Sequence, residues 1–107
     1  NILKFNMKKI FLILFFFIIS KQVYSDPKMD LGLNIFNNTA QCSTCHVLKA
    51  ANSNGALGPN LDEIRPIKEQ VINSVKNGIG VMPSFEGILT EEEIEAVSYF
   101  VSESAGK

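Results

Sequence analysis

Apolar side chains recur every three or four positions in three windows of this chain, the spacing that places residues on one face of an α-helix. The first window is "MDLGLNIFNN", in which Leu31 and Ile35 are four positions apart and Phe36 follows directly. Asp30 stands just before this apolar set and is suited to cap a helix N-terminus. The pattern predicts a first helix that begins after Asp30.

The second window predicts a helix that starts around Pro66, because proline fits the first turn of a helix. The predicted helix ends at Asn77-Gly78, which is a typical C-cap sequence. Its apolar face consists of Ile67, Val71, Ile72 and Val75.

The third window has the clearest N-terminal signal. Thr90 followed three positions later by Glu93 predicts a capping box, and the acidic residues of the first turn suit the positive end of the helix dipole. The apolar face of this helix consists of Ile94, Val97, Phe100 and Val101.

Two long stretches without helical period, residues 47–61 and 79–89, separate these windows, and both contain glycine and proline. No window alternates with a period of two residues. The predicted fold class is therefore all-α, a small domain of three to four helices with long loops. Long loops are uncommon in compact domains unless they have a function, and loops wrapped around a rigid apolar object would explain them.

The N-terminal part reads as a secretory signal peptide. From Met7 the chain has two lysines, an apolar run over residues 10–19, and a polar stretch that ends in small residues suited to cleavage after Ser25. A retained membrane anchor is the alternative, but the run is about half as long as the roughly 20 residues that a bilayer span needs. We expect residues 1–25 to comprise upstream residues and a cleaved leader with its start at Met7, and residues 26–107 to form the mature domain, without a retained membrane span.

The charge and size of residues 26–107 limit the function further. This part keeps six basic and eleven acidic residues, a formal charge of −5. Nucleic acid is not an expected partner, because binding it depends on Lys and Arg that neutralise phosphates. A domain of about 80 residues also buries little apolar surface and usually needs a disulfide, a metal or a cofactor to be stable.

The chemistry is concentrated in "CSTCH", which holds both cysteines, Cys42 and Cys45, and the only histidine, His46. A structural zinc ion needs four ligands, so it would require a carboxylate or a ligand from another chain. A redox-active Cys-x-x-Cys pair normally follows a strand and begins a helix, and no strand is predicted here. A structural disulfide between the two cysteines closes a loop too short to add much stability.

Covalent haem accounts for all three residues, because Cys-x-x-Cys-His is the attachment signature of c-type haem. Cys42 and Cys45 would form thioethers to the porphyrin, and His46 would reach the iron from one side. A second axial ligand must come from elsewhere in the chain. Met82 lies in a loop bounded by Gly and Pro that can travel round the ring, whereas Met29 has no such loop; the alternative for Met82 is a flexible core filler.

Taken together, "CSTCH", "GPNL", "VKNGIGVMPSF" and the C-terminal amphipathic helix resemble a small class I monohaem cytochrome c over residues 30–104. The resemblance implies that Gly32 and Phe36 of the first helix pack against Val97 and Phe100 of the last. It implies that the carbonyl of Pro59 accepts a hydrogen bond from the ring of the proximal histidine. It also implies that Met82 is the distal ligand.

The apolar residues of the two loops and of the second helix are expected around the haem. They are Leu57, Leu61, Ile64, Val71, Ile72, Val75, Phe85 and Leu89, of which we take Leu57, Leu61, Ile72, Val75 and Phe85 as the predicted pocket residues. The chain has no tryptophan to place beside a haem propionate, so the sequence leaves the propionate partners open.

The predicted function is that of a periplasmic (or thylakoid-lumen) one-electron carrier with one covalent haem c, no zinc and no enzymatic activity, between respiratory or photosynthetic redox proteins. With both His46 and Met82 bound, no position on the iron is open to a substrate. The alternatives are a haem c subunit of an extracytoplasmic dehydrogenase and, more remotely, a five-coordinate haem enzyme or sensor. The charge suggests redox partners with a basic docking surface, and the chain is expected to be a monomer or weak oligomer.

Overall fold

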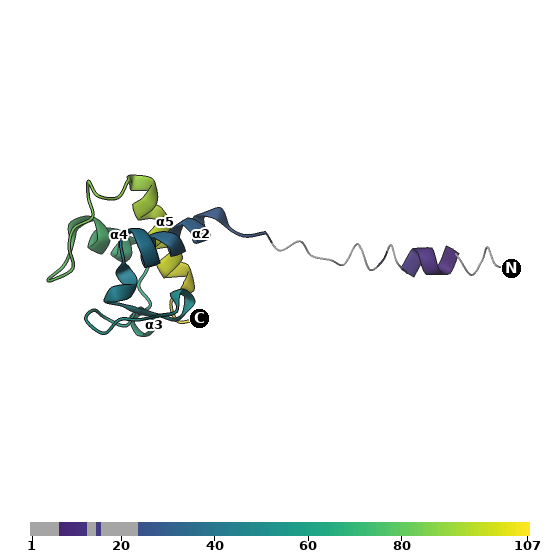
Figure 1. The fold of residues 1–107 in the computed structure, drawn as a ribbon, viewed down its shortest axis with the longest axis horizontal. Coiled ribbons are helices and arrows are strands. Elements are labelled where there is room, and N and C mark those ends of the chain that lie inside the picture. The colour runs from purple at the N-terminus through teal and green to yellow at the C-terminus, as the bar shows by residue number, and fades with distance from the viewer. Residues whose placement is uncertain (1–6, 13–14, 16–23) are drawn as a thin grey trace.

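The computed structural model of the chain describes residues 7–12, 15 and 24–107 (Figure 1). Residues 7–12 are helical and exposed, whereas most of the predicted leader, including residues 16–23, lies outside the described residues. The leader and its cleavage after Ser25 therefore stay predictions. Within the described ranges, no helix has the length and apolar character needed to cross a membrane.

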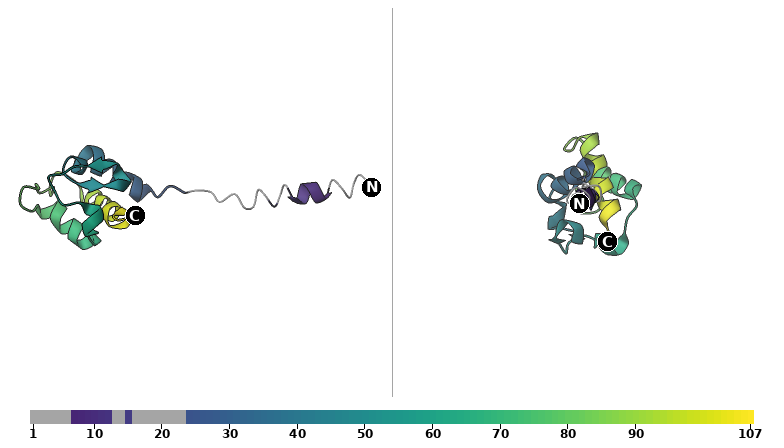
Figure 2. Two further views of the ribbon diagram at one scale, coloured as in Figure 1. Left: turned by 90° about the horizontal axis from the view of Figure 1, so that it is seen from below. Right: turned by 90° about the vertical axis from the view of Figure 1, so that its right-hand side faces the viewer.

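The domain is built on the crossing of its first and last helices, α2 (Pro27–Asn34) and α5 (Glu91–Ser104), which lie against each other in both views of Figure 2. A Cβ atom added to Gly32 would lie 2.4 Å from the Cβ of Phe100, so only glycine permits this approach. The rings of Phe36 and Phe100 meet edge to face, with centroids 6.0 Å apart. The predicted contacts of Gly32 and Phe36 with Phe100 are confirmed, and the other close neighbour of Gly32 is Ala96.

The start of α2 corrects the sequence prediction. The N-cap is Asp26, whose carboxylate accepts a hydrogen bond from the backbone N–H of Lys28 at 3.0 Å, and not Asp30, which lies in the first turn. Pro27 occupies the first turn, where its missing N–H costs nothing. Beyond Asn34 the chain continues as a π-helical turn, η1 (Ile35–Thr39), so the helical segment is longer at both ends than its apolar pattern suggested.

The second predicted helix is α4 (Lys68–Asn77), which packs against α5 and buries Val71 and Val75. Its predicted end is confirmed, with Gly78 at the C-cap in a positive-φ conformation (φ 73°). Its predicted start is two residues too early, because Ile67 is the extended N-cap and Pro66 precedes it.

The predicted capping box of α5 is confirmed. The hydroxyl of Thr90 accepts from the Glu93 N–H at 3.1 Å, and the Glu93 carboxylate accepts from the Thr90 N–H at 3.0 Å. The predicted apolar face of this helix is buried throughout: Ile94, Val97, Phe100 and Val101.

Short elements organise the cysteine turn and the segment after it, including the loop over residues 47–61 that was predicted as irregular. They are η2 (Cys42–Thr44), β1 (Val47–Leu48), η3 (Lys49–Ala51), β2 (Ser53–Asn54) and α3 (Leu61–Ile64). The two strands pair antiparallel, with Leu48 opposite Ser53, and α3 is capped by the side chain of Asn60. Strands of two residues show no alternation in a sequence, which is why the pattern missed them. The all-α class is confirmed, with this small hairpin added.

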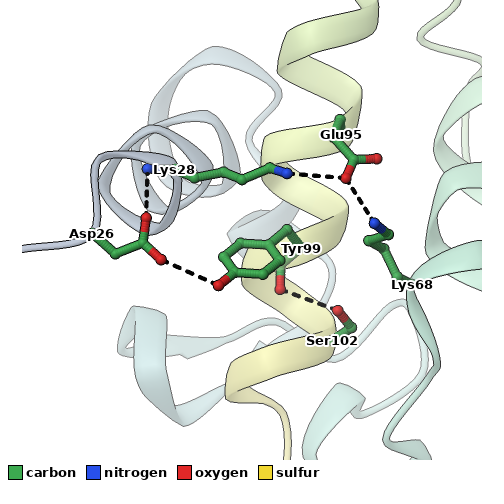
Figure 3. Close-up of polar contacts among 6 residues, drawn as sticks. All are labelled: Asp26, Lys28, Lys68, Glu95, Tyr99 and Ser102. Atoms are coloured by element: carbon green, nitrogen blue, oxygen red, sulfur yellow. Dashed lines mark hydrogen bonds and ion pairs between the residues drawn. The ribbon is translucent and has the colours of Figure 1, made fainter.

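A polar network on the surface joins α2, α4 and α5 (Figure 3). Glu95 of α5 accepts from Lys68 of α4 at 2.8 Å and from Lys28 of α2 at 3.1 Å through the same oxygen. The hydrogen bonds from Lys68 and Lys28 lower the pKa of Glu95. Beside it, the Tyr99 hydroxyl donates to Asp26 at 3.2 Å, and the Lys28 ammonium lies 4.9 Å from the centre of the Tyr99 ring. The network ties the three helices together at one end of the crossing.

This network predicts a pH-dependent loss of stability in Glu95→Gln. Because the folded-state pKa of Glu95 lies below its ordinary value of 4.5, its stabilisation is present above that value and is lost as pH falls through the folded pKa. At pH 7 we expect a Tm lower by about 2–5 °C, since exposed ion pairs contribute little. Thermal unfolding followed by circular dichroism at several pH values measures the difference.

The control is Glu86→Gln, which removes an acidic charge from an exposed loop position. It should leave Tm nearly unchanged at every pH. The Tm difference between Glu95→Gln and the wild type should shrink at pH values where the Glu95 carboxyl of the wild type is protonated. A difference that stays the same there would contradict the ion-pair explanation.

Candidate functional site

Cys42, Cys45 and His46 lie on one tight helical turn. Gln41, in the left-handed conformation (φ 53°), directly precedes η2. The N–H groups of Cys45 and His46 both donate to the carbonyl of Cys42, at 3.1 and 3.0 Å. The three side chains predicted to act together are thus brought together by the first few residues after the π-helical turn. Both thiols are free and half-buried.

The Cys42 thiol has an apolar environment. It packs against the edge of the hydrophobic core, and burial raises the pKa of Cys42 to about 11. At neutral pH this side chain is therefore a neutral thiol that behaves as a small hydrophobic group. Such a position suits a sulfur that is to lie against the edge of an apolar ring.

The imidazole of His46 is oriented by the carbonyl of Pro59, with 2.8 Å between Nδ1 and the oxygen. A carbonyl can only accept, so Nδ1 must carry the ring proton and donate it. Nε2 then keeps its lone pair, which is the form of histidine that binds a metal. The structure contains the contact that the resemblance implies, and this contact leaves the lone pair of the other ring nitrogen free.

Two glycines that the sequence analysis left without a role bring the 55–60 segment against the cysteine turn. The N–H of Gly58 donates to the Cys45 carbonyl at 2.7 Å, and a Cβ on Gly58 would lie 2.6 Å from Cε1 of His46. A Cβ on Gly55 would lie 2.5 Å from the backbone carbon of Cys45. These close approaches hold Pro59 where its carbonyl meets the imidazole. The Gly-Pro pair of "GPNL" is the sequence signal that could have identified Gly58.

Met82 lies on the loop between α4 and α5, which Figure 1 shows in green. It closes a tight turn with Ile79, in which each residue donates its N–H to the carbonyl of the other, at 3.1 and 2.9 Å. The Met82 side chain is half-buried against the hydrophobic core. Met29, the other candidate, lies on α2, the helix that packs on α5.

The predicted pocket residues fall into three groups by exposure. Leu61 and Val75 are buried in the core, Ile72 and Phe85 are half-buried against it, and Leu57 is 79 % exposed. Further exposed apolar side chains lie at the end of α3, at Ile64, and on the 79–89 loop, at Ile79, Val81 and Ile88. All five pocket assignments stay predictions.

The donor set fits a covalently attached haem. Two free thiols three residues apart can form thioethers, an imidazole with a free Nε2 can bind iron, and a thioether is available from a separate loop. The exposed apolar side chains of both loops can cover an apolar ring.

The sequence and fold resemble those of known proteins. Residues 27–101 match the family described as cytochrome C oxidase, cbb3-type, subunit III. The cytochrome c6 of Gracilaria tenuistipitata var. liui is 36 % identical over 99 residues, which cover 85 % of this chain and 86 % of that protein. The cytochrome c6 of Euglena gracilis is 39 % identical over 82 residues, 70 % of this chain and 91 % of its own.

A solved structure gives the same picture. The c-type cytochrome SorU from Sinorhizobium meliloti superposes with a TM-score of 0.73 and 50 % sequence identity, over 78 % of this chain and 97 % of that one. The match spans nearly the full length of that protein, so the similarity concerns the whole domain rather than the cysteine motif alone.

The close packing at Gly58 predicts that Gly58→Ala destabilises the protein by about 1–3 kcal/mol, the usual cost of overpacking. The added methyl group would collide with the imidazole of His46 and push it away from Pro59. Guanidinium unfolding of the exported protein measures the loss. The control is Ala56→Ser at an exposed position of the same loop, and equal stabilities for the two variants would contradict the packing argument.

Proposed function

Since this chain belongs to the cytochrome c family and is a haem c electron carrier, we propose that it is an exported carrier of single electrons that holds one haem through Cys42 and Cys45, with His46 and Met82 as axial ligands. The observation that supports this most directly is the hydrogen bond of 2.8 Å between Nδ1 of His46 and the carbonyl of Pro59, directly behind the two thiols. It leaves Nε2 free to bind iron.

The two cysteines attach the cofactor. Each thiol would add across one vinyl group of a haem, with the sulfur on one vinyl carbon and the thiol proton on the other, so attachment would need no oxidant or reductant. The three-residue spacing on one turn would let both sulfurs reach the same edge of the ring. The resulting thioethers hold the group permanently in an exported protein.

The axial residues decide between electron transfer and catalysis. Bound haem supplies an iron whose charge changes by one. With His46 and Met82 as its ligands from this chain, a haem iron would have no position left for a substrate, and the soft thioether would raise the reduction potential. The chain therefore acts as a carrier rather than an enzyme.

The surface charge indicates the kind of partner. Residues 26–107 carry a formal charge of −5, so a basic docking surface on the donor or acceptor would speed association. We propose periplasm or an equivalent lumen as the compartment, because the leader predicted over residues 7–25 directs export. The helical domain begins at Asp26, and Tyr24 and Ser25 are exposed, so cleavage after Ser25 would spare the folded unit.

A subunit of a larger oxidoreductase is the second candidate, because the matching family is described by the name of an oxidase subunit. The relatives of similar length, named cytochrome c6, favour the free carrier. Purification of the protein from its native membranes or periplasm at high salt decides between the two. A free carrier elutes alone, whereas a permanent subunit stays with a partner.

The ligand assignment predicts the spectrum of Met82→Ala. Loss of the thioether opens one axial position, so the ferric protein should become high-spin, lose its weak near-infrared iron–sulfur band and show a lower reduction potential. Visible and near-infrared spectra with a redox titration measure all three. The matched control, Met29→Ala, should keep the wild-type band and potential. If the Met29 variant showed these changes instead, Met29 rather than Met82 would be the ligand.

A further inference from the structure

The turn that carries Met82 is attached to the end of α4. The last carbonyls of an α-helix have no partner within the helix, and other groups must bind them. Here the Ser74 carbonyl accepts from the Gly78 N–H at 2.8 Å, the usual C-cap bond. The next two carbonyls, of Val75 and Lys76, accept from residues that follow Met82 in the chain: the Phe85 N–H at 2.8 Å and the Ser84 hydroxyl at 2.6 Å.

Two glycines between the end of α4 and Met82 also set the path of the turn. A Cβ on Gly78 would lie 2.7 Å from the Met82 carbonyl oxygen and 2.9 Å from the Ser84 nitrogen, so the backbone of residues 82–84 passes close to this C-cap residue. Gly80 has a φ of 57°, which lets the chain close the two-residue turn between Ile79 and Met82. The position of Met82 is therefore set by contacts on both sides of it.

Ser84 is the first anchor on the C-terminal side. Pro83 follows Met82 directly and has no N–H, so its backbone cannot donate a hydrogen bond. The Ser84 hydroxyl takes over this role by donating to the Lys76 carbonyl, and it also accepts weakly from the Glu86 N–H at 3.4 Å. One exposed side chain thus links the methionine turn to both α4 and the following loop.

We propose that Ser84 is a positioning residue for the axial thioether: its hydroxyl holds the turn against α4 and so keeps the sulfur of Met82 directed at the iron. The inference rests on the proposed role of Met82 as ligand. Removing the anchor increases the fraction of molecules in which the turn has moved away. An exogenous ligand then competes more easily for that axial position.

Imidazole is the probe, because it binds ferric haem iron when the thioether leaves. We expect the apparent affinity of the purified haem-loaded protein for imidazole to rise about 3- to 10-fold in Ser84→Ala. This factor corresponds to the net free energy of one hydrogen bond. Ser84→Thr keeps a hydroxyl and should restore an affinity near that of the wild type. A visible-spectrum titration, with the near-infrared band recorded in parallel, measures the affinities.

The matched control is Ser102→Ala, which removes a hydroxyl that donates to the Tyr99 carbonyl at 3.1 Å in α5. It should leave the imidazole affinity unchanged, because it removes a hydroxyl that makes no contact with the turn. An affinity that is unchanged in Ser84→Ala, or raised equally in Ser102→Ala, would overturn the proposal while Met82 ligation stands. A wild-type protein without the iron–sulfur band would overturn Met82 ligation, and the role of Ser84 with it.

Discussion

The hydrogen bond from His46 to the carbonyl of Pro59 fixes the direction of the imidazole ring, and the rest of the site depends on that direction. A histidine free to rotate would offer either nitrogen to a metal, and the bond at 2.8 Å removes that freedom. The bond exists only because Gly58 lets the following backbone approach the ring. The cysteine turn and the 55–60 segment are thus one structural unit, and the rest of the fold keeps that unit in place.

The helices supply the frame in which the two loops can act. The α2–α5 crossing depends on Gly32, and α4 packs on the same last helix. From this frame, one loop carries the thiols and the imidazole, and the other, tied to the end of α4, carries Met82. A domain with so small a core gains from a cofactor that both loops would cover. Electron transfer would benefit from the same rigidity, because a site that moves little on changing charge reorganises little.

Residues that act locally could be read from the sequence pattern, whereas tertiary approaches came only from the family resemblance, as for Gly32, or were missed, as for Gly58. Thr90 with Glu93, and Gly78 after α4, signalled helix ends through bonds made within a few residues, and these predictions are confirmed. Asp26 was missed because Asp30 stands closer to the apolar pattern, although a proline just after a capping residue was a usable signal. Gly58 matters because its backbone lies against the ring of His46, twelve positions earlier, and no local sequence pattern reveals such a contact.

The central claim is that a haem is covalently attached to this chain, and mass spectrometry under denaturing conditions tests it most directly. The chain is produced with its leader in a host that has haem-attachment machinery, and the exported fraction is unfolded in acid before measurement. The account predicts the mass of residues 26–107 plus one haem, and loss of the attached haem when both Cys42 and Cys45 are replaced by serine. A mass equal to that of the bare polypeptide would contradict it.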